Sequence, residues 1–125
     1  MQAAFGHVAD DAVPVIAAAL NLSRADVHGV LTFYHDFRRA PAGRHVLKLC
    51  SAEACQSMGG AALQDHAIRR LRTPMHSARS DGAVTLEPVY CLGLCSAAPA
   101  AMLDGQVVAR LTPKRLDALL DGIAA

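Results

Sequence analysis

Four cysteines, arranged as two close pairs, are the residues of this sequence best suited to chemistry. Cys50 and Cys55 flank four residues in "CSAEACQSMGG", and Cys91 and Cys95 flank three residues in "CLGLCSAAPA". The chain contains no other cysteine. Four thiolates are the usual ligand set of a two-iron iron–sulfur cluster, and two local pairs suit its two metal ions. The first interpretation of this spacing is therefore an iron–sulfur cluster that both pairs bind.

Three other uses of the four thiols stay open at this point. Structural zinc accepts gaps of two to four residues between ligands, so spacing alone does not exclude it. Thiol–disulfide catalysis normally uses a C-x-x-C motif, which the chain lacks. Buried cysteines also act as small hydrophobic residues, although close pairing of all four disfavours that interpretation.

The residues around the cysteines favour a cluster over a polar site. They are small and uncharged apart from Glu53, so backbone N–H groups can approach the sulfurs: Ala52, Ala54, Gly93, Ser96, Ala97 and Ala98. We expect Gly93 to adopt a positive φ in the tight turn between Cys91 and Cys95. Cys55 is expected near a helix N-terminus, where the helix dipole favours a thiolate. The gaps of four and three residues between the paired cysteines differ from the spacings of the common ferredoxins.

Composition excludes several other functions. The net charge is +1 and the pI about 7.8, which gives no basic footprint for nucleic acid. No nucleotide-binding glycine loop and no nucleophile–base grouping is present, so we predict no catalytic residue. The histidines are scattered, and none lies between paired cysteines, which disfavours a histidine-ligated cluster: His7, His28, His35, His45, His66 and His76.

The sequence shows no sign of export or membrane insertion. The longest apolar run covers residues 12–20, is shorter than the roughly 20 residues of a spanning helix and includes Pro14. The first residues lack the basic start of a secretory signal. We therefore expect reduced thiols and a cytoplasmic location.

Periodicity divides the chain into two parts. Apolar residues at helical spacing cover residues 13–20, and Ser23 with Asp26 forms a capping box before a second helix, so a helical hairpin is expected. The turn-forming "RAPAGR" at residues 39–44 ends this helical part.

The second part is predicted to combine strands and helices. Strands are predicted at 45–49 and 83–90, a helix from about 57 to 72, and a strand pair joined at Asp104–Gly105. Thr112 is expected to cap a final helix that begins at Pro113. The basic run at 69–79 is interpreted as a helix C-terminus.

The predicted elements bring the two cysteine pairs together. A strand–helix–strand unit of this length normally has parallel strands. Both pairs follow the carboxyl ends of these strands, where α/β proteins place their ligands. We therefore expect both pairs at one edge of the sheet.

Two segments carry a resemblance to a known family. "VTLEPVYCLGLCSAAPAAMLDG" and "VHGVLTFYHDF" (residues 27–37) resemble signatures of the 24-kDa subunit family of NADH dehydrogenases. The gaps of four and three residues are also that family's, and the resemblance runs from about residue 10 to the end of the chain. Within the family, "EACQSMGG" is similar to the gamma subunit of NAD-dependent, molybdenum-containing formate dehydrogenases. Members run somewhat longer at the N-terminus, so part of the first helix is expected to be missing.

The resemblance implies a fold, a cofactor and partners. The fold would be α/β, a thioredoxin-like mixed β-sheet with flanking helices, preceded by an N-terminal helical hairpin. Residues 1–41 would be a helical docking segment and residues 42–125 a thioredoxin-like [2Fe–2S] domain. Cys50 and Cys55 would hold one iron, and Cys91 and Cys95 the other. FMN, NAD and the molybdenum cofactor would reside on partner subunits.

The function implied is one-electron transfer. The chain would exchange electrons with the FMN- and NAD-binding subunit of a soluble formate dehydrogenase that also contains a molybdenum subunit. The alternative parents are respiratory NADH:quinone oxidoreductase and NAD-reducing hydrogenase. A zinc-stabilised interaction module is the more remote alternative.

Overall fold

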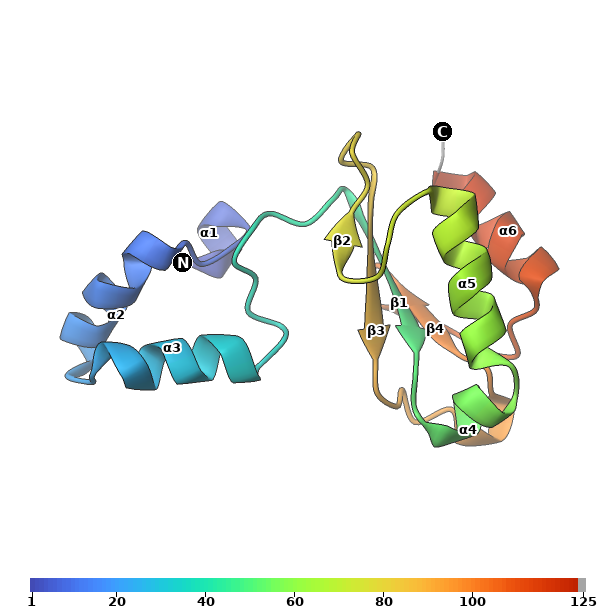
Figure 1. Cartoon of the computed structure of the whole chain (residues 1–125), viewed down its shortest axis with the longest axis horizontal. Coiled ribbons are helices and arrows are strands. Elements are labelled where there is room, and N and C mark those ends of the chain that lie inside the picture. Colours follow the sequence, from blue (N-terminus) through green and yellow to red (C-terminus); the bar gives the residue numbers. More distant parts are fainter. Residues whose placement is uncertain (124–125) are drawn as a thin grey trace. The chain divides into compact units, whose positions relative to one another are not determined.

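The computed structural model describes residues 1–123, and the chain divides into two compact units between Ala42 and Gly43. The first is helical and the second is built on a β-sheet (Figure 1). Within the described residues, no helix is long and apolar enough to cross a membrane.

The N-terminal unit is the predicted helical hairpin with a short additional helix before it. Its elements are α1 (Gln2–Phe5), the 3₁₀ turn η1 (Asp10–Ala12), α2 (Val13–Leu20) and α3 (Arg24–Phe33). The capping box is confirmed: Ser23 Oγ accepts from the backbone N–H of Asp26, and Asp26 Oδ2 accepts from that of Ser23, both at 3.1 Å. The sequence analysis missed α1 and η1. The core of this unit is small: Val8, Val13, Ala17, Val27 and Leu31.

The second unit contains a five-stranded mixed sheet. Its strands are β1 (His45–Cys50), β2 (Ser77–Ala78), β3 (Val84–Val89), β4 (Ala101–Leu103) and β5 (Gln106–Val108), in the order β2-β3-β1-β4-β5. Strands β1 and β3 are parallel, as predicted, and the other pairs are antiparallel. The predicted hairpin around Asp104–Gly105 is also confirmed.

Two helices cover one face of this sheet, α5 (Gly60–Leu71) and α6 (Pro113–Ile123) (Figure 1). Alternate residues of the central strands face them, because side chains in a strand alternate between the two faces. Thr112 Oγ1 accepts from the N–H of Arg115, so the predicted cap of α6 is confirmed. The buried residues between sheet and helices are mainly leucine: Leu47, Leu49, Leu63, Ala67, Leu71, Val84, Leu86, Ala101, Leu111, Leu116 and Leu120.

One predicted boundary was wrong. The helix expected from about Ser57 begins only at Gly60, as α5, because Gly59 adopts a φ of 92°, and the separate short helix α4 (Glu53–Ser57) before it was not predicted. The basic run at 69–79 was predicted to be a helix C-terminus, and its first part is one: Arg69 and Arg70 lie in the last turn of α5, which ends at Leu71 before the left-handed Arg72. The run then continues into β2, which pairs with β3.

Candidate metal centre

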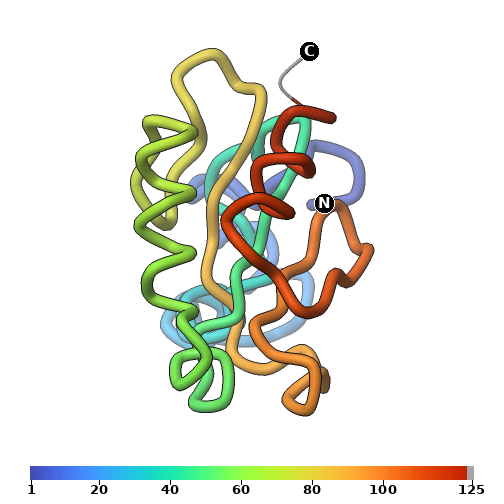
Figure 2. Tube along the Cα trace, turned by 90° about the vertical axis from the view of Figure 1, so that its right-hand side faces the viewer, coloured from blue at the N-terminus to red at the C-terminus, as the bar shows by residue number. Residues whose placement is uncertain are grey.

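The two cysteine pairs lie at one edge of the sheet. Cys50 is the last residue of β1 and pairs in register with Val89, the last residue of β3. Cys91 follows two residues later, so both pairs leave the sheet at the carboxyl ends of parallel strands. Figures 1 and 2 both show the loop after β1, with α4, beside the loop after β3. Parallel pairing is therefore what brings segments about forty residues apart to one place.

The first pair is buried. Cys50 and Cys55 have exposed fractions of only 4% and 3%. The strand end is anchored because the N–H of Cys50 donates to the carbonyl of Ala100 at 3.0 Å. Cys55 is the third residue of α4, as expected from its place near a helix start. Both thiols pack in an apolar cluster with Ala100, and further apolar residues contact it: Ala52, Val89, Leu92, Leu94 and Ala98.

The second pair is exposed and lies in a tight loop. The Sγ atoms of Cys91 and Cys95 are 3.6 Å apart, and the N–H of Gly93 points at Cys91 Sγ at 3.3 Å. Gly93 has a φ of 75°, as predicted, and Cys91 has the same value. Only glycine adopts this conformation without strain. The positive φ of Cys91 could not be predicted, because nothing in its residue type signals it.

Hydrogen bonding favours the thiolate form of Cys50. Burial acts to raise the pKa of the Cys50 thiol, but hydrogen bonds outweigh it and lower the pKa overall. The donors include the Cys55 thiol and three backbone N–H groups, from Ala52, Cys91 and Leu92. Hydrogen bonds to the charged form favour a thiolate. The surroundings of Cys50 therefore favour the charged form that a metal ligand requires.

The remaining thiols respond to one another's charge. Burial, followed by the hydrogen bond with Cys50, raises the pKa of Cys55, and the charges of Cys50 and Cys95 add to the increase. The hydrogen bond with Cys91, followed by the charge of Cys91, raises the pKa of Cys95, and the Cys50 charge contributes as well. Like charges close together disfavour full ionisation. Cations between the pairs would relieve this repulsion.

The chemistry of this edge fits a [2Fe–2S] cluster. Four thiols are offered in two pairs, the wall around Cys50 and Cys55 is apolar, and backbone N–H groups point at sulfur. Among residues 1–123, no group of three or more His, Cys, Asp or Glu side chains is placed to hold one metal ion. Two thiols for each of two irons is the donor arrangement that a four-cysteine [2Fe–2S] cluster uses.

Gly60 is a site residue that the sequence analysis missed. It is the first residue of α5, and a Cβ on it would lie 2.7 Å from the backbone oxygen of Cys55. The same atom would lie 3.5 Å from the backbone oxygen of Cys50. A side chain at this position would therefore push against the backbone that carries the first pair. The adjacent glycines in "MGG" were the available signal.

Two histidines contact carboxylates rather than the cysteines. His45 Nδ1 lies 2.7 Å from Asp104 Oδ2, at the opposite end of β1 from Cys50. His66 Nε2 lies 2.7 Å from Asp117 Oδ1 and links α5 to α6. Both contacts therefore belong to the scaffold of the sheet and its helices.

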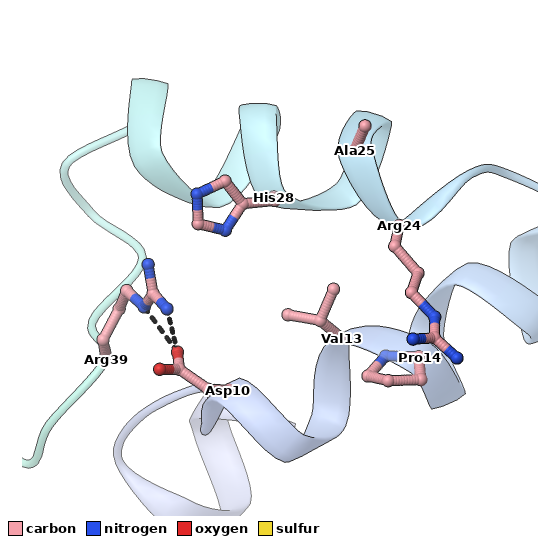
Figure 3. A pocket seen from close by; sticks show the side chains of 7 residues that line it. All are labelled: Asp10, Val13, Pro14, Arg24, Ala25, His28 and Arg39. Atoms are coloured by element: carbon pink, nitrogen blue, oxygen red, sulfur yellow. Dashed lines mark hydrogen bonds and ion pairs between the residues drawn. The ribbon is translucent and has the colours of Figure 1, made fainter.

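The N-terminal unit carries a separate groove of about 420 Å³ (Figure 3). Arg39 forms an ion pair with Asp10 at its edge, with Nε donating to Oδ1 at 2.7 Å. The groove is lined by residues that include no cysteine: Asp10, Val13, Pro14, Arg24, Ala25, His28 and Arg39.

Comparison with known proteins identifies one family and several relatives of this chain. Residues 1–124 match the thioredoxin-like [2Fe–2S] ferredoxin family. The chain is 37% identical over 116 residues to the E subunit of NADH-quinone oxidoreductase from Escherichia coli strain K12, and 35% identical to its counterpart from Pseudomonas aeruginosa. These matches cover 93% of this chain and 70% of each relative.

Solved structures agree with this fold. An NAD⁺-reducing [NiFe]-hydrogenase superimposes with a TM-score of 0.75 and 26% identity, over 91% of this chain but only 20% of the hydrogenase chain. The wild-type thioredoxin-like [2Fe–2S] ferredoxin from Aquifex aeolicus superimposes with a TM-score of 0.53 and 13% identity. That match covers 64% of this chain and 84% of the ferredoxin, and it supports the fold alone. The chain belongs to the thioredoxin-like [2Fe–2S] ferredoxin family, whose members carry a [2Fe–2S] cluster.

Proposed function

We propose that the chain is a one-electron transfer subunit whose cluster is held by Cys50, Cys55, Cys91 and Cys95. The observation that carries the proposal is the convergence of both pairs at one sheet edge, where Cys50 ends β1 in register with Val89 and Cys91 follows Val89 two residues later. In this assignment Cys50 and Cys55 hold one iron, and Cys91 and Cys95 hold the other. The bound cluster supplies reversible uptake of one electron.

The protein's own contribution is to hold and tune this centre. The buried pair fixes one side in an apolar wall that excludes water, which strengthens electrostatic interactions there. Hydrogen bonding favours negative charge on the Cys50 sulfur, and the N–H of Gly93 donates to Cys91 Sγ. Hydrogen bonds to sulfur tune cluster potentials. The exposed pair leaves the other side open to a redox partner.

The partner is the FMN- and NAD-binding subunit of the same complex, and the N-terminal unit docks on it. Support comes from aromatic side chains exposed at and after the end of α3: Phe33, Tyr34 and Phe37 are 72%, 56% and 40% exposed. The rings of Phe33 and Tyr34 already pack edge to face, with centroids 5.0 Å apart. Preformed aromatic anchors are typical of protein interfaces. The proposed use of four reduced thiols supports a cytoplasmic location for this complex.

The comparisons favour a parent complex of the NADH-quinone oxidoreductase type, because the curated relatives are E subunits of that enzyme. The NAD⁺-reducing hydrogenase matches a larger share of this chain's fold than the isolated ferredoxin does. A second candidate is a formate dehydrogenase with a molybdenum subunit. It rests on the run Gln56 and Met58–Gly59 alone, as the sequence resemblance indicated.

One preparation tests the cluster assignment. Purified without oxygen, the chain is expected to absorb visible light and to contain two irons and two acid-labile sulfides. Cys91→Ser should lose this absorption while its far-ultraviolet circular dichroism stays unchanged, because Cys91 is exposed and adds little to the core. A colourless protein with stoichiometric zinc would contradict the proposal, and full absorption in Cys91→Ser would contradict the ligand assignment.

Co-purification tests the parent complex. A tagged chain isolated from its own cells under mild conditions is expected to bring down a flavoprotein that oxidises NADH. A quinone-reducing membrane assembly supports the oxidoreductase assignment, and a nickel–iron protein supports the hydrogenase. A molybdoprotein that oxidises formate would instead establish the second candidate.

A further inference from the structure

The two cysteine pairs differ sharply in their access to solvent. Cys50 and Cys55 are 4% and 3% exposed, whereas Cys91 and Cys95 are both exposed. The pairs have similar spacing in sequence, with four and three residues between their members. The chain thus contains one buried and one exposed pair of thiols. The reactivity of the exposed pair can therefore be compared with that of the buried pair in the same molecule.

The exposed pair is close to the geometry of a disulfide. Its Sγ atoms are 3.6 Å apart, and a disulfide bond is about 2.05 Å long. Both side chains are exposed, so they can rotate without displacing a core residue. Gly93 lies between them and provides backbone freedom, because it adopts a φ of 75°.

We propose that, in the chain without its cluster, Cys91 and Cys95 are a modification site for small disulfides of the glutathione type. These oxidants convert the pair to an intramolecular disulfide, while Cys50 and Cys55 stay reduced. The proposal uses residues of the proposed cluster site, but the oxidation itself does not require that the cluster assignment is correct.

The reaction is two successive thiol–disulfide exchanges. One thiolate of the pair attacks a sulfur of glutathione disulfide, which breaks the S–S bond, forms a mixed disulfide and releases one glutathione thiolate. The neighbouring thiol then attacks the protein sulfur of the mixed disulfide and releases the second glutathione. Two protein thiols are oxidised and one glutathione disulfide is reduced, and the two thiol protons pass to the released thiolates or to solvent.

Burial protects the other pair. Attack on glutathione disulfide requires an accessible thiolate, and Cys50 and Cys55 are only 4% and 3% exposed. A disulfide at the exposed pair removes two of the four proposed ligands, so it blocks cluster insertion until a reductant opens it. Oxidation at this loop would therefore control when the chain can accept its cluster.

The test uses the full-length chain, freed of its cluster by chelation under reducing conditions. Circular dichroism first verifies that this chain is folded. After incubation with glutathione disulfide, free thiols are alkylated with N-ethylmaleimide, under native conditions and after unfolding, and cysteine peptides are identified by mass. We expect loss of two of the four thiols, a disulfide that links Cys91 to Cys95, and alkylated Cys50 and Cys55 after unfolding. A Cys50–Cys55 disulfide, equal loss of all four thiols or no loss would overturn the proposal.

Two variants separate the steps. Cys95→Ser should retain glutathione as a mixed disulfide on Cys91, because the second exchange has lost its thiol. Cys55→Ser should form the Cys91–Cys95 disulfide like the wild type. Glutathione retained as a mixed disulfide in the Cys55→Ser variant would overturn the proposal.

Cluster loading supplies an independent measurement. Oxidised chain given iron and sulfide should fail to develop visible absorption and should recover it after treatment with dithiothreitol. A reduced chain that takes up no cluster contradicts the proposed function alone. A chain that takes up the cluster but never forms the Cys91–Cys95 disulfide overturns this inference alone.

Discussion

At the scale of single residues, Gly60 shows how closely the scaffold approaches the proposed ligands. The Cβ of Gly60→Ala would lie 2.7 Å from the backbone oxygen of Cys55, and backbone atoms must move to accept it. We expect this variant to lower the free energy of unfolding by about 1–3 kcal/mol and to weaken cluster retention. Urea unfolding and the decay of visible absorption measure the two effects.

Gly122→Ala is the matched control for this substitution. Gly122 also lies in a helix, α6, but a Cβ there meets no atom within 4 Å. Replacement of an unhindered helical glycine by alanine is neutral or stabilises by up to about 1 kcal/mol. Similar losses in both variants would show that the close approach of Gly60 to Cys55 is not the cause.

The different burial of the two pairs predicts different effects on the stability of the cluster-free chain. Cys50→Ser places a hydroxyl in the apolar cluster beside Ala100 and should lower the free energy of unfolding by about 1–3 kcal/mol. Cys95→Ser changes an exposed residue and should stay within about 0.5 kcal/mol of the wild type. Urea unfolding under reducing conditions measures both. Equal losses would mean that burial does not distinguish the pairs.

At the scale of secondary-structure elements, Asp104 joins the β4–β5 turn to β1. Its Oδ1 accepts from the N–H of Val46 at 2.8 Å, and its Oδ2 lies 2.7 Å from His45 Nδ1. Asp104 also has a φ of 51°, which asparagine tolerates better than alanine. We expect Asp104→Ala to lower the free energy of unfolding by about 1–2 kcal/mol, and Asp104→Asn by less. Urea unfolding at neutral pH tests this order, and equal losses would contradict it.

The same carboxylate predicts a pH dependence of stability. Burial acts to raise the pKa of Asp104, but hydrogen bonds with His45 and the N–H of Val46 outweigh it and lower the pKa. Since the folded-state pKa is depressed, the stabilisation is present above the unfolded-state pKa of about 3.9 and is lost as the pH falls through the folded-state pKa. The difference in unfolding free energy between wild type and Asp104→Asn should therefore shrink in acid. A constant difference would rule out this carboxylate as its source.

The elements that the sequence predicted correctly are those with a local signal. The capping box at Ser23, the turn at Asp104–Gly105 and the cap at Thr112 depend on neighbouring residues, and all three are confirmed. Strand β2 has only two residues and exists because β3 lies beside it, which no local pattern encodes. The start of α5 at Gly60 was also not predicted, and Gly60 lies so close to the backbone of Cys55 that a Cβ would be 2.7 Å from its oxygen, a contact between residues that local patterns do not encode. The sequence predicted the four thiols but not which pair is buried.

At the scale of the whole molecule, the two units have separate cores. Residues Met1–Ala42 pack around five small apolar side chains, whereas Gly43–Ala125 contains the leucine-rich core and all four cysteines. Domains below roughly 40 residues seldom fold alone without additional support, and the N-terminal unit is close to that limit. The division of cores therefore separates the unit that contains all four cysteines from the N-terminal unit, for which we propose a docking role.

This division predicts the behaviour of the shortened chain 43–125. Because its core and its four thiols are complete, we expect it to fold, to show the circular dichroism of a mixed α/β unit and to take up iron and sulfide with the same visible spectrum as the full chain. It should lose co-purification with the flavin subunit, since the exposed aromatic side chains of α3 and the segment after it are absent. Phe33→Ala in the full chain is the matched control: it should weaken co-purification and leave the cluster spectrum unchanged. A shortened chain that still binds the flavoprotein as tightly as the full chain would refute the docking role and leave the cluster assignment intact.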